Sequence, residues 1–233
     1  MILIIGDIHG RYKTINEQII YAEEYCDARV SAVIQLGDFG IYKRSLAQYF
    51  NGIPERNFKR PVYVIDGNHE DFVYLDILTE KYKDHFTYLP RCAVNNIKGY
   101  NFLSLGGSAY MDPVNTPPGA TLNDEDIEKC LSYRPDDVDI IISHDCPRGI
   151  GVPGTPGFEY CDPIGFFRSD EIKEHFKPKI WFFAHHHKWF NHDDGKTQYY
   201  GLHLALNGFA LLDDNYDLKI IKSPLKISSE GKF

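Results

Sequence analysis

The segment ILIIGDIHG, residues 2–10, joins a short apolar run to a turn that carries an aspartate and a histidine. An unbroken apolar run that ends at a glycine predicts a buried β-strand over residues 2–5. Ile15, Ile19 and Ala22 follow at helical spacing, which predicts a helix. The chain therefore opens as strand, loop and helix, the unit from which α/β proteins are built.

The same pattern recurs along the chain. Further apolar runs each end in a polar turn: 32–36 before Gly37-Asp38, 62–65 before Gly67-Asn68-His69, 140–142 before His144, and 180–183 before His185-His186-His187. Short apolar stretches separated by turns between Gln198 and Ile221 predict antiparallel strands. We therefore expect an α/β fold with sheets packed face to face and helices outside. The polar residues that follow the strands should converge on one rim.

Composition predicts one domain over residues 1–233. The chain is 43% hydrophobic and 25% charged, which is an ordinary globular composition. No apolar run approaches the ~18–20 residues that span a bilayer, and the first residues lack a basic stretch and a cleavage site. We expect a cytoplasmic protein without a membrane partner.

The cysteines indicate the redox state of the chain, and the net charge indicates which partners it disfavours. The five cysteines are odd in number and widely scattered, which predicts reduced thiols: Cys26, Cys92, Cys130, Cys146 and Cys161. The formal net charge of −8 argues against long nucleic acid as a partner.

The side chains after the strands are oxygen and imidazole donors: Asp7, His9, Asp38, Asn68, His144, His185 and His187. Without a thiolate, this mixture suits Mn²⁺, Fe²⁺ or Zn²⁺. With His69 there are eight such side chains, more than one ion needs. A carboxylate can bridge two ions ~3.5–4 Å apart, so we expect a binuclear site.

Five clusters in order resemble the calcineurin-like metallophosphoesterase superfamily: GDIHG (6–10), GD (37–38), GNHE (67–70), SHD (143–145) and AHHH (184–187). The resemblance implies a four-layer α/β/β/α sandwich of two mixed sheets flanked by helices. It also implies a phosphoric ester hydrolase, either a phosphomonoesterase or a phosphodiesterase.

By position, the resemblance implies two metal sites. Asp7, His9, Asp38 and His187 would hold one ion, and Asp38, Asn68, His144 and His185 the other, with Asp38 bridging. A hydroxide between the two ions would attack phosphorus in line, and His69 would protonate the leaving group. Mn²⁺ is the first expectation, with Fe²⁺ or Zn²⁺ as alternatives. Alternation along an extended segment would turn His186 away from the site.

The sequence departs from the family pattern in two places. Ala184 replaces the usual glycine. In the protein-phosphatase branch, GD is followed by a second Asp that orients the catalytic His and by an Arg that grips phosphate, whereas Phe39-Gly40-Ile41 follow here. Candidates for orienting His69 are Asp66, Glu70 and Asp71, and candidates for binding phosphate are Arg11, Arg148 and Arg168.

Two alternatives remain open at this point. SHDCPR (143–148) resembles the corresponding stretch of RNA lariat debranching enzymes, which cleave a 2′–5′ phosphodiester, although those enzymes typically carry Cys in place of Asp7 and are longer. A nucleotide or nucleic-acid phosphodiesterase is therefore one alternative. A non-catalytic scaffold is the other, disfavoured because all eight positions are occupied. Loops 147–165 and 106–119 are expected to form the substrate-side rim.

Overall fold

The computed structural model describes residues 1–51, 56–154 and 163–222, and its first sheet has six strands. Their order is β12 (Leu218–Ile221), β11 (Phe209–Leu212), β1 (Ile2–Ile5), β2 (Ala32–Leu36), β3 (Val62–Ile65) and β4 (Thr87–Tyr88). Strands β1 to β4 run parallel, and β11 and β12 continue the sheet antiparallel.

The second sheet also has six strands. Their order is β5 (Ala93–Ile97), β6 (Tyr100–Leu105), β7 (Ile140–Ser143), β8 (Ile180–Phe183), β10 (Gln198–Gly201) and β9 (Phe190–Asp193). The four inner strands are parallel, whereas β5 and β9 pair antiparallel at the two edges. Both sheets are mixed, as the family resemblance implied.

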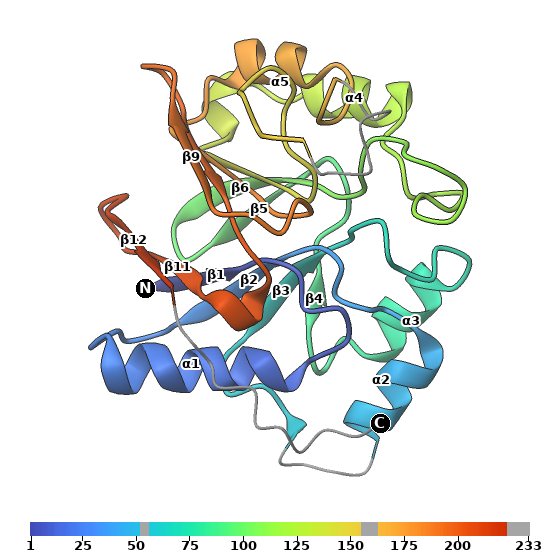
Figure 1. Ribbon diagram of the computed structural model, residues 1–233, viewed down its shortest axis with the longest axis vertical. Coiled ribbons are helices and arrows are strands. Elements are labelled where there is room, and N and C mark those ends of the chain that lie inside the picture. The colour runs from blue at the N-terminus through green and yellow to red at the C-terminus, as the bar shows by residue number, and fades with distance from the viewer. Residues whose placement is uncertain (52–55, 155–162, 223–233) are drawn as a thin grey trace.

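Helices cover the outer face of each sheet, so the molecule has four layers (Figure 1). Below the first sheet lie α1 (Lys13–Tyr25), α2 (Lys43–Phe50) and α3 (Leu75–Lys81), and above the second lie α4 (Asp124–Leu131) and α5 (Ser169–Phe176). Short 3₁₀ turns occur at Pro135–Asp137 and Ala205–Asn207. The predicted α/β/β/α sandwich is confirmed. In the described ranges, no helix is long and apolar enough to cross a membrane.

Strand β1 shows why the strands are continuously apolar. Ile2 and Ile4 belong to the core between the two sheets, whereas Leu3 and Ile5 belong to the core between the first sheet and its helices. Alternate residues face opposite sides of a sheet, and here both sides are covered. Complete burial of each such side chain contributes roughly 1.5–3 kcal/mol, which holds the ends of these strands in fixed positions.

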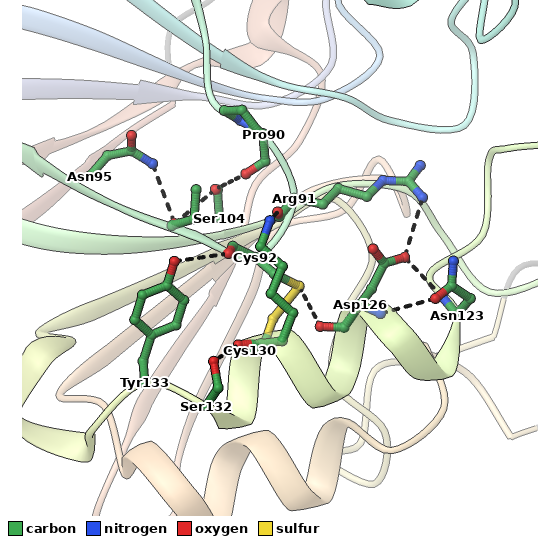
Figure 2. The surroundings of a disulfide bond; sticks show 12 residues. Pro90, Arg91, Cys92, Asn95, Ser104, Asn123, Asp126, Cys130, Ser132 and Tyr133 are labelled. Atoms are coloured by element: carbon green, nitrogen blue, oxygen red, sulfur yellow. Dashed lines mark hydrogen bonds and ion pairs between the residues drawn. A yellow bond between two sulfur atoms is a disulfide. The ribbon is translucent and has the colours of Figure 1, made fainter.

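A disulfide joins Cys92, just before β5, to Cys130 in α4 (Figure 2). The Cα atoms are 4.9 Å apart although 38 positions separate the residues in sequence. The expectation of five reduced thiols is therefore wrong for this pair. Packing of α4 against β5 brings the two residues together, and their spacing gives no sign of it. Cys26 and Cys146 are free, and Cys161 lies outside the described residues.

Candidate metal centre

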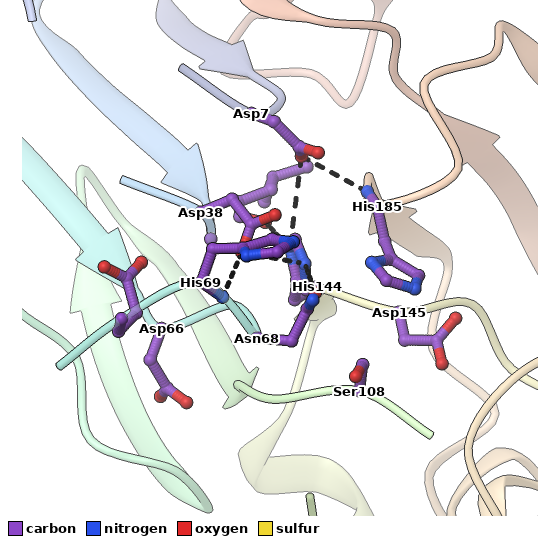
Figure 3. Close-up of polar contacts among 12 residues, drawn as sticks. Asp7, Asp38, Asp66, Asn68, His69, Ser108, His144, Asp145 and His185 are labelled. Atoms are coloured by element: carbon purple, nitrogen blue, oxygen red, sulfur yellow. Dashed lines mark hydrogen bonds and ion pairs between the residues drawn. The ribbon is translucent and has the colours of Figure 1, made fainter. Parts of the chain in front are cut away.

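The turns that follow five parallel strands meet at one rim, as the sequence predicted from the apolar runs. From the first sheet come Asp7 and His9 after β1, Asp38 after β2, and Asn68 and His69 after β3. From the second sheet come His144 after β7, and His185 and His187 after β8. Figure 3 shows the labelled side chains of this rim drawn together from both sheets.

One group of donors surrounds the carboxylate of Asp7. Its Oδ2 atom lies 2.6 Å from Nε2 of His187 and 3.8 Å from Nε2 of His9. The two imidazole Nε2 atoms are 3.2 Å apart. Three ligand atoms therefore point at one small volume, from turns that are 178 residues apart in sequence.

A second group surrounds His144. Its Nε2 atom lies 3.0 Å from Oδ1 of Asn68 and 3.4 Å from Oδ1 of Asp38. The ring centroid of His185 is 4.9 Å from that of His144. The other ring nitrogen of His144 is 2.7 Å from the carbonyl oxygen of Leu36, which assigns the proton to Nδ1 and leaves the Nε2 lone pair directed into the site.

Asp38 faces both groups. Its Oδ1 atom approaches His144, and its Oδ2 atom lies 3.8 Å from Nδ1 of His9. Oδ1 also accepts the backbone N–H of His69 at 2.8 Å, which fixes the carboxylate. Each oxygen of one buried carboxylate is thus directed toward a different donor group.

The backbone at these positions adopts an uncommon conformation. His9, Asp38, His185 and His187 all have positive φ angles, of 46°, 52°, 63° and 50°. Such conformations cost of order 1–3 kcal/mol each in non-glycine residues and cluster at functional sites. Four occurrences at one rim indicate that the surrounding structure holds the turns in place to aim these side chains.

Gly37 and Gly67 allow the close approach that the two groups require. A Cβ atom on Gly37 would collide with the ring of His144, and one on Gly67 would collide with the carboxylate of Asp38. Neither position could therefore carry a side chain without displacing a donor.

The prediction that the side chain of His186 points away from the site is wrong. Its side chain lines the same pocket as His185 and His187, and its Nε2 atom lies 2.9 Å from Oδ1 of Asp145. The expected alternation requires an extended segment, but positive φ angles at His185 and His187 turn the chain at both neighbours. Strand periodicity carries no signal for the contact between His186 and Asp145, which therefore appears only in the structure.

The charges of the site shift several pKa values. Burial by itself would raise the pKa of Asp7, but its short contact with His187 and the other nearby imidazoles hold that pKa well below the usual range. Burial lowers the pKa of His144, yet Asp38 and Asp7 outweigh it and raise the value overall. The short contact with Asp7 raises the pKa of His187, whereas burial lowers that of His185 to about 4.

The donor set fits divalent cations. Oδ2 of Asp7 is buried and, among the described residues, has no hydrogen-bond partner of acceptable geometry, although His187 lies 2.6 Å away. A buried carboxylate oxygen in that position is costly unless a cation or a proton satisfies it. Imidazole, carboxylate and amide donors suit Mn²⁺, Fe²⁺ and Zn²⁺. Two groups of three donors, Asp7, His9, His187 and Asp38, His144, His185, each lie close enough to share an ion.

His69 lies at the pocket, but none of the residues expected to orient it does so. Its ring lines the cavity, 5.6 Å from the ring of His9, and forms no hydrogen bond with any described residue. The Asp66 carboxylate instead accepts hydrogen bonds from Arg91 and Tyr88, and Figure 3 shows it directed away from the cluster. Although Asp66 and His69 are close in sequence, the turn after β3 directs their side chains to different places.

Glu70 supports the turn after β2. Its buried carboxylate accepts the backbone N–H groups of Phe39, Gly40 and Ile41 at 2.8, 3.0 and 2.5 Å. Phe39 occupies the position at which the protein-phosphatase branch carries a second Asp, and it is fully buried beneath the first sheet. The turn that bears Asp38 is therefore held by Glu70 from below and has no orienting carboxylate of its own.

The three candidate arginines lie in different places. Arg168 is committed to Glu171, Asp124 and Glu128 and does not line the pocket. Arg148 donates to the carbonyl oxygen of Gly165, a residue of the pocket wall. Arg11 is exposed beside the turn of His9, where it lines a separate groove and also a small cavity shared with Asp7, His9 and His187. The structure thus brings no candidate arginine into the pocket itself.

The pocket beside the two donor groups has a volume of about 200 Å³. Ala109, Met111 and Ile164 give it an apolar wall, so parts of both expected rim loops line it. Of the loop 147–165, residues 155–162 lie outside the described residues. In the other loop, the carbonyl oxygen of Asn115 accepts a 2.7 Å hydrogen bond from the side-chain amide of Asn68, whose own oxygen is thereby turned toward His144. The sequence carries no signal for this backbone contact.

Comparison with known proteins gives a family match and shared folds. The sequence profile of the calcineurin-like phosphoesterase family matches residues 1–189. A lariat debranching enzyme of Entamoeba histolytica is 24% identical over 242 residues, covering 86% of this chain and 68% of that enzyme.

Solved structures share the fold. One crystal structure superposes with a TM-score of 0.69 at 15% identity, over 95% of this chain and 98% of the other. A protein of Thermus thermophilus superposes with a TM-score of 0.62 at 13% identity, over 95% and 97% of the two chains. At these identities the likeness concerns the arrangement of the sheets and helices.

Proposed function

Because the chain belongs to the calcineurin-like phosphoesterase family, and is thus a metal-dependent phosphoester hydrolase, we propose that it cleaves a phosphodiester at this rim. The observation that carries the choice of a diester is the lining of the pocket. Among the described residues no arginine or lysine lines it, and Ala109, Met111 and Ile164 form an apolar wall. A diester carries one negative charge and brings a second organic substituent, which this wall would contact. A monoester dianion in this pocket would meet, in the described part of the chain, no arginine or lysine side chain for its additional charge.

Asp7, His9, Asp38 and His187 would hold one divalent ion, and Asp38, Asn68, His144 and His185 the other, with Asp38 shared. Each oxygen of Asp38 is directed toward a different group, which supports its bridging role. Bound there, the ions would supply a water of lowered pKa and positive charge for the phosphate oxygens. Mn²⁺ is the first choice for both positions because it accepts mixed carboxylate, amide and imidazole ligation.

His69 would donate a proton to the leaving oxygen. Its ring lines the pocket next to His9, and no described residue occupies its ring nitrogens. Its backbone N–H donates to Asp38, so the main chain at His69 is held by the same carboxylate that the two ions would share. A proton donor in that position faces whatever substituent leaves the phosphorus.

Hydrolysis of bis-p-nitrophenyl phosphate and p-nitrophenyl phosphate tests the proposal. Chelated protein reconstituted with Mn²⁺ should cleave the diester faster than the monoester. Asp38→Asn should bind fewer than two ions and lose about 10²-fold or more in diester hydrolysis, since the bridging charge is removed. Asp84→Asn, which changes an exposed carboxylate between α3 and β4, serves as the matched control. Preferred turnover of the monoester would overturn the choice of a diester.

A nucleotide or nucleic-acid phosphodiester is a more specific candidate. The likeness to a debranching enzyme, 24% identical over most of this chain, supports it. The scaffold alternative predicts fully metallated protein that hydrolyses neither aryl ester.

A further inference from the structure

A groove separate from the pocket begins at the turn of His9. It has a volume of about 830 Å³ and follows the start of α1 toward α2 and residues 56–59. His9 lines both the groove and the pocket, so the two cavities adjoin at a proposed metal ligand.

The groove is basic although the chain carries a net charge of −8. Its lining contains four cations and one carboxylate: Arg11, Lys13, Arg56, Lys59 and Glu17. Glu17 lies 3.4 Å from Lys13 and compensates only that charge. In the described part of the chain, the side chains of Arg11 and Lys59 are exposed and pair with no carboxylate. Positive charges gathered in a concave surface raise the local concentration of anions.

Arg56 is held in place without being neutralised. Its guanidinium donates to the carbonyl oxygens of Gln48 and Tyr49 and lies 5.6 Å above the ring of Tyr49. The half-buried ring of Tyr49 lines the groove beside these cations. The ring itself is covered by this guanidinium and by Phe58, so what the groove offers a ligand is positive charge. Positively charged grooves are typical of proteins that follow the backbone of single-stranded nucleic acid.

We propose that this groove binds the phosphates that flank the scissile phosphodiester in a single-stranded oligonucleotide. The inference rests on the proposed function for the position of the scissile bond and extends it to the rest of the substrate. A strand with one phosphate at the donor groups passes His9 and brings neighbouring phosphates to Arg11 and Lys59. No lysine or arginine of the described ranges lines the pocket, so the groove provides the side-chain charge that retains a longer substrate.

Binding without metal separates this inference from the proposed function. Chelated protein comprising residues 1–233 is titrated into a fluorescein-labelled single-stranded 10-mer, and anisotropy is recorded at several salt concentrations. Arg11→Glu and Lys59→Glu should each weaken binding five- to tenfold. Each should also reduce the slope of log K against log[salt] by about 1. Lys219→Glu, an equal charge change at an exposed position of β12, should alter affinity less than twofold.

Inorganic tripolyphosphate supplies the second arm. If it binds with the same dependence on Arg11 and Lys59 while the 10-mer does not, the ligand is a polyphosphate and the assignment of a nucleic-acid strand is overturned. If both groove variants bind the 10-mer as Lys219→Glu does, the groove is not a substrate site. Neither outcome depends on hydrolysis, whose failure would instead count against the proposed function.

Discussion

At the scale of single residues, the role proposed for His69 depends on the leaving group. His69→Ala should lower kcat by 10²–10⁴-fold for alkyl diesters, because a poor leaving oxygen requires a proton. The loss should be much smaller for bis-p-nitrophenyl phosphate, whose leaving group departs as a stable anion. Metal content, measured by mass spectrometry, should stay at two ions. An equal loss with both kinds of ester would contradict proton donation and indicate a role in positioning.

The histidines of the rim predict how metal affinity changes with pH. The pKa values of His144 and His187 are raised in the metal-free protein, so both imidazoles retain protons above the ordinary histidine range. A proton on either ring must leave before an ion binds, and affinity should therefore fall as pH falls. Calorimetric titration with Mn²⁺ should show at least tenfold weaker binding at pH 6 than at pH 8, with proton release.

In the metal-free protein, the free energy of unfolding depends on pH in the opposite direction to metal affinity. A histidine whose folded pKa is raised stabilises the fold below its unfolded pKa, and that contribution is lost as pH rises through the folded pKa. Mild acidification should therefore increase the contribution of these two residues to the stability of chelated protein. The same acidification should destabilise metallated protein, because the ions bind more weakly. Affinity for Mn²⁺ that does not change between pH 8 and pH 6 would show that these imidazoles are not ligands.

At the scale of elements, the disulfide ties α4 to the edge of the second sheet. It closes a loop of 38 residues, and a cross-link of that length contributes about 2–4 kcal/mol by restricting the unfolded chain. The variant Cys92→Ser/Cys130→Ser should therefore unfold at lower denaturant concentration, with a free energy of unfolding reduced by about that amount. Cys26→Ser, which removes a free thiol from the end of α1, is the matched control.

Reducing agent provides a second measurement for the same pair. Dithiothreitol should destabilise the wild-type protein as much as the double substitution does, and should leave the double variant unchanged. Equal stability of reduced and oxidised wild type would mean that packing of Ile127 and its neighbours holds α4 without the cross-link.

At the scale of the whole molecule, the site depends on two sheets that share one core. Ile4 and Ile34 of the first sheet pack with Phe182 of the second, so the sheets bury their inner faces against each other. We propose that residues 1–233 form one domain, which should unfold in a single calorimetric transition whose van't Hoff and calorimetric enthalpies agree. Two resolved transitions would contradict this.

The sequence by itself determined the strands and the donor residues. An apolar run such as Ile2–Ile5 carries its own signal, because a strand covered on both faces must be apolar throughout. The glycine and the Asp or His that follow belong to the same short segment, so neighbouring residues suffice to identify them. The packing of sheets face to face, the helices outside them and the convergence of the turns were therefore predictable, whereas the two mixed sheets followed from the family resemblance.

Only the tertiary structure decided the contacts between distant segments. The Cys92–Cys130 bond, the pairing of His186 with Asp145, the bond from Asn68 to the carbonyl of Asn115 and the basic groove at His9 all join separate parts of the chain. Each depends on how elements pack or on backbone angles such as those of His185 and His187. Local periodicity carries no information on the packing of distant elements or on these backbone angles, because both are set by the whole fold.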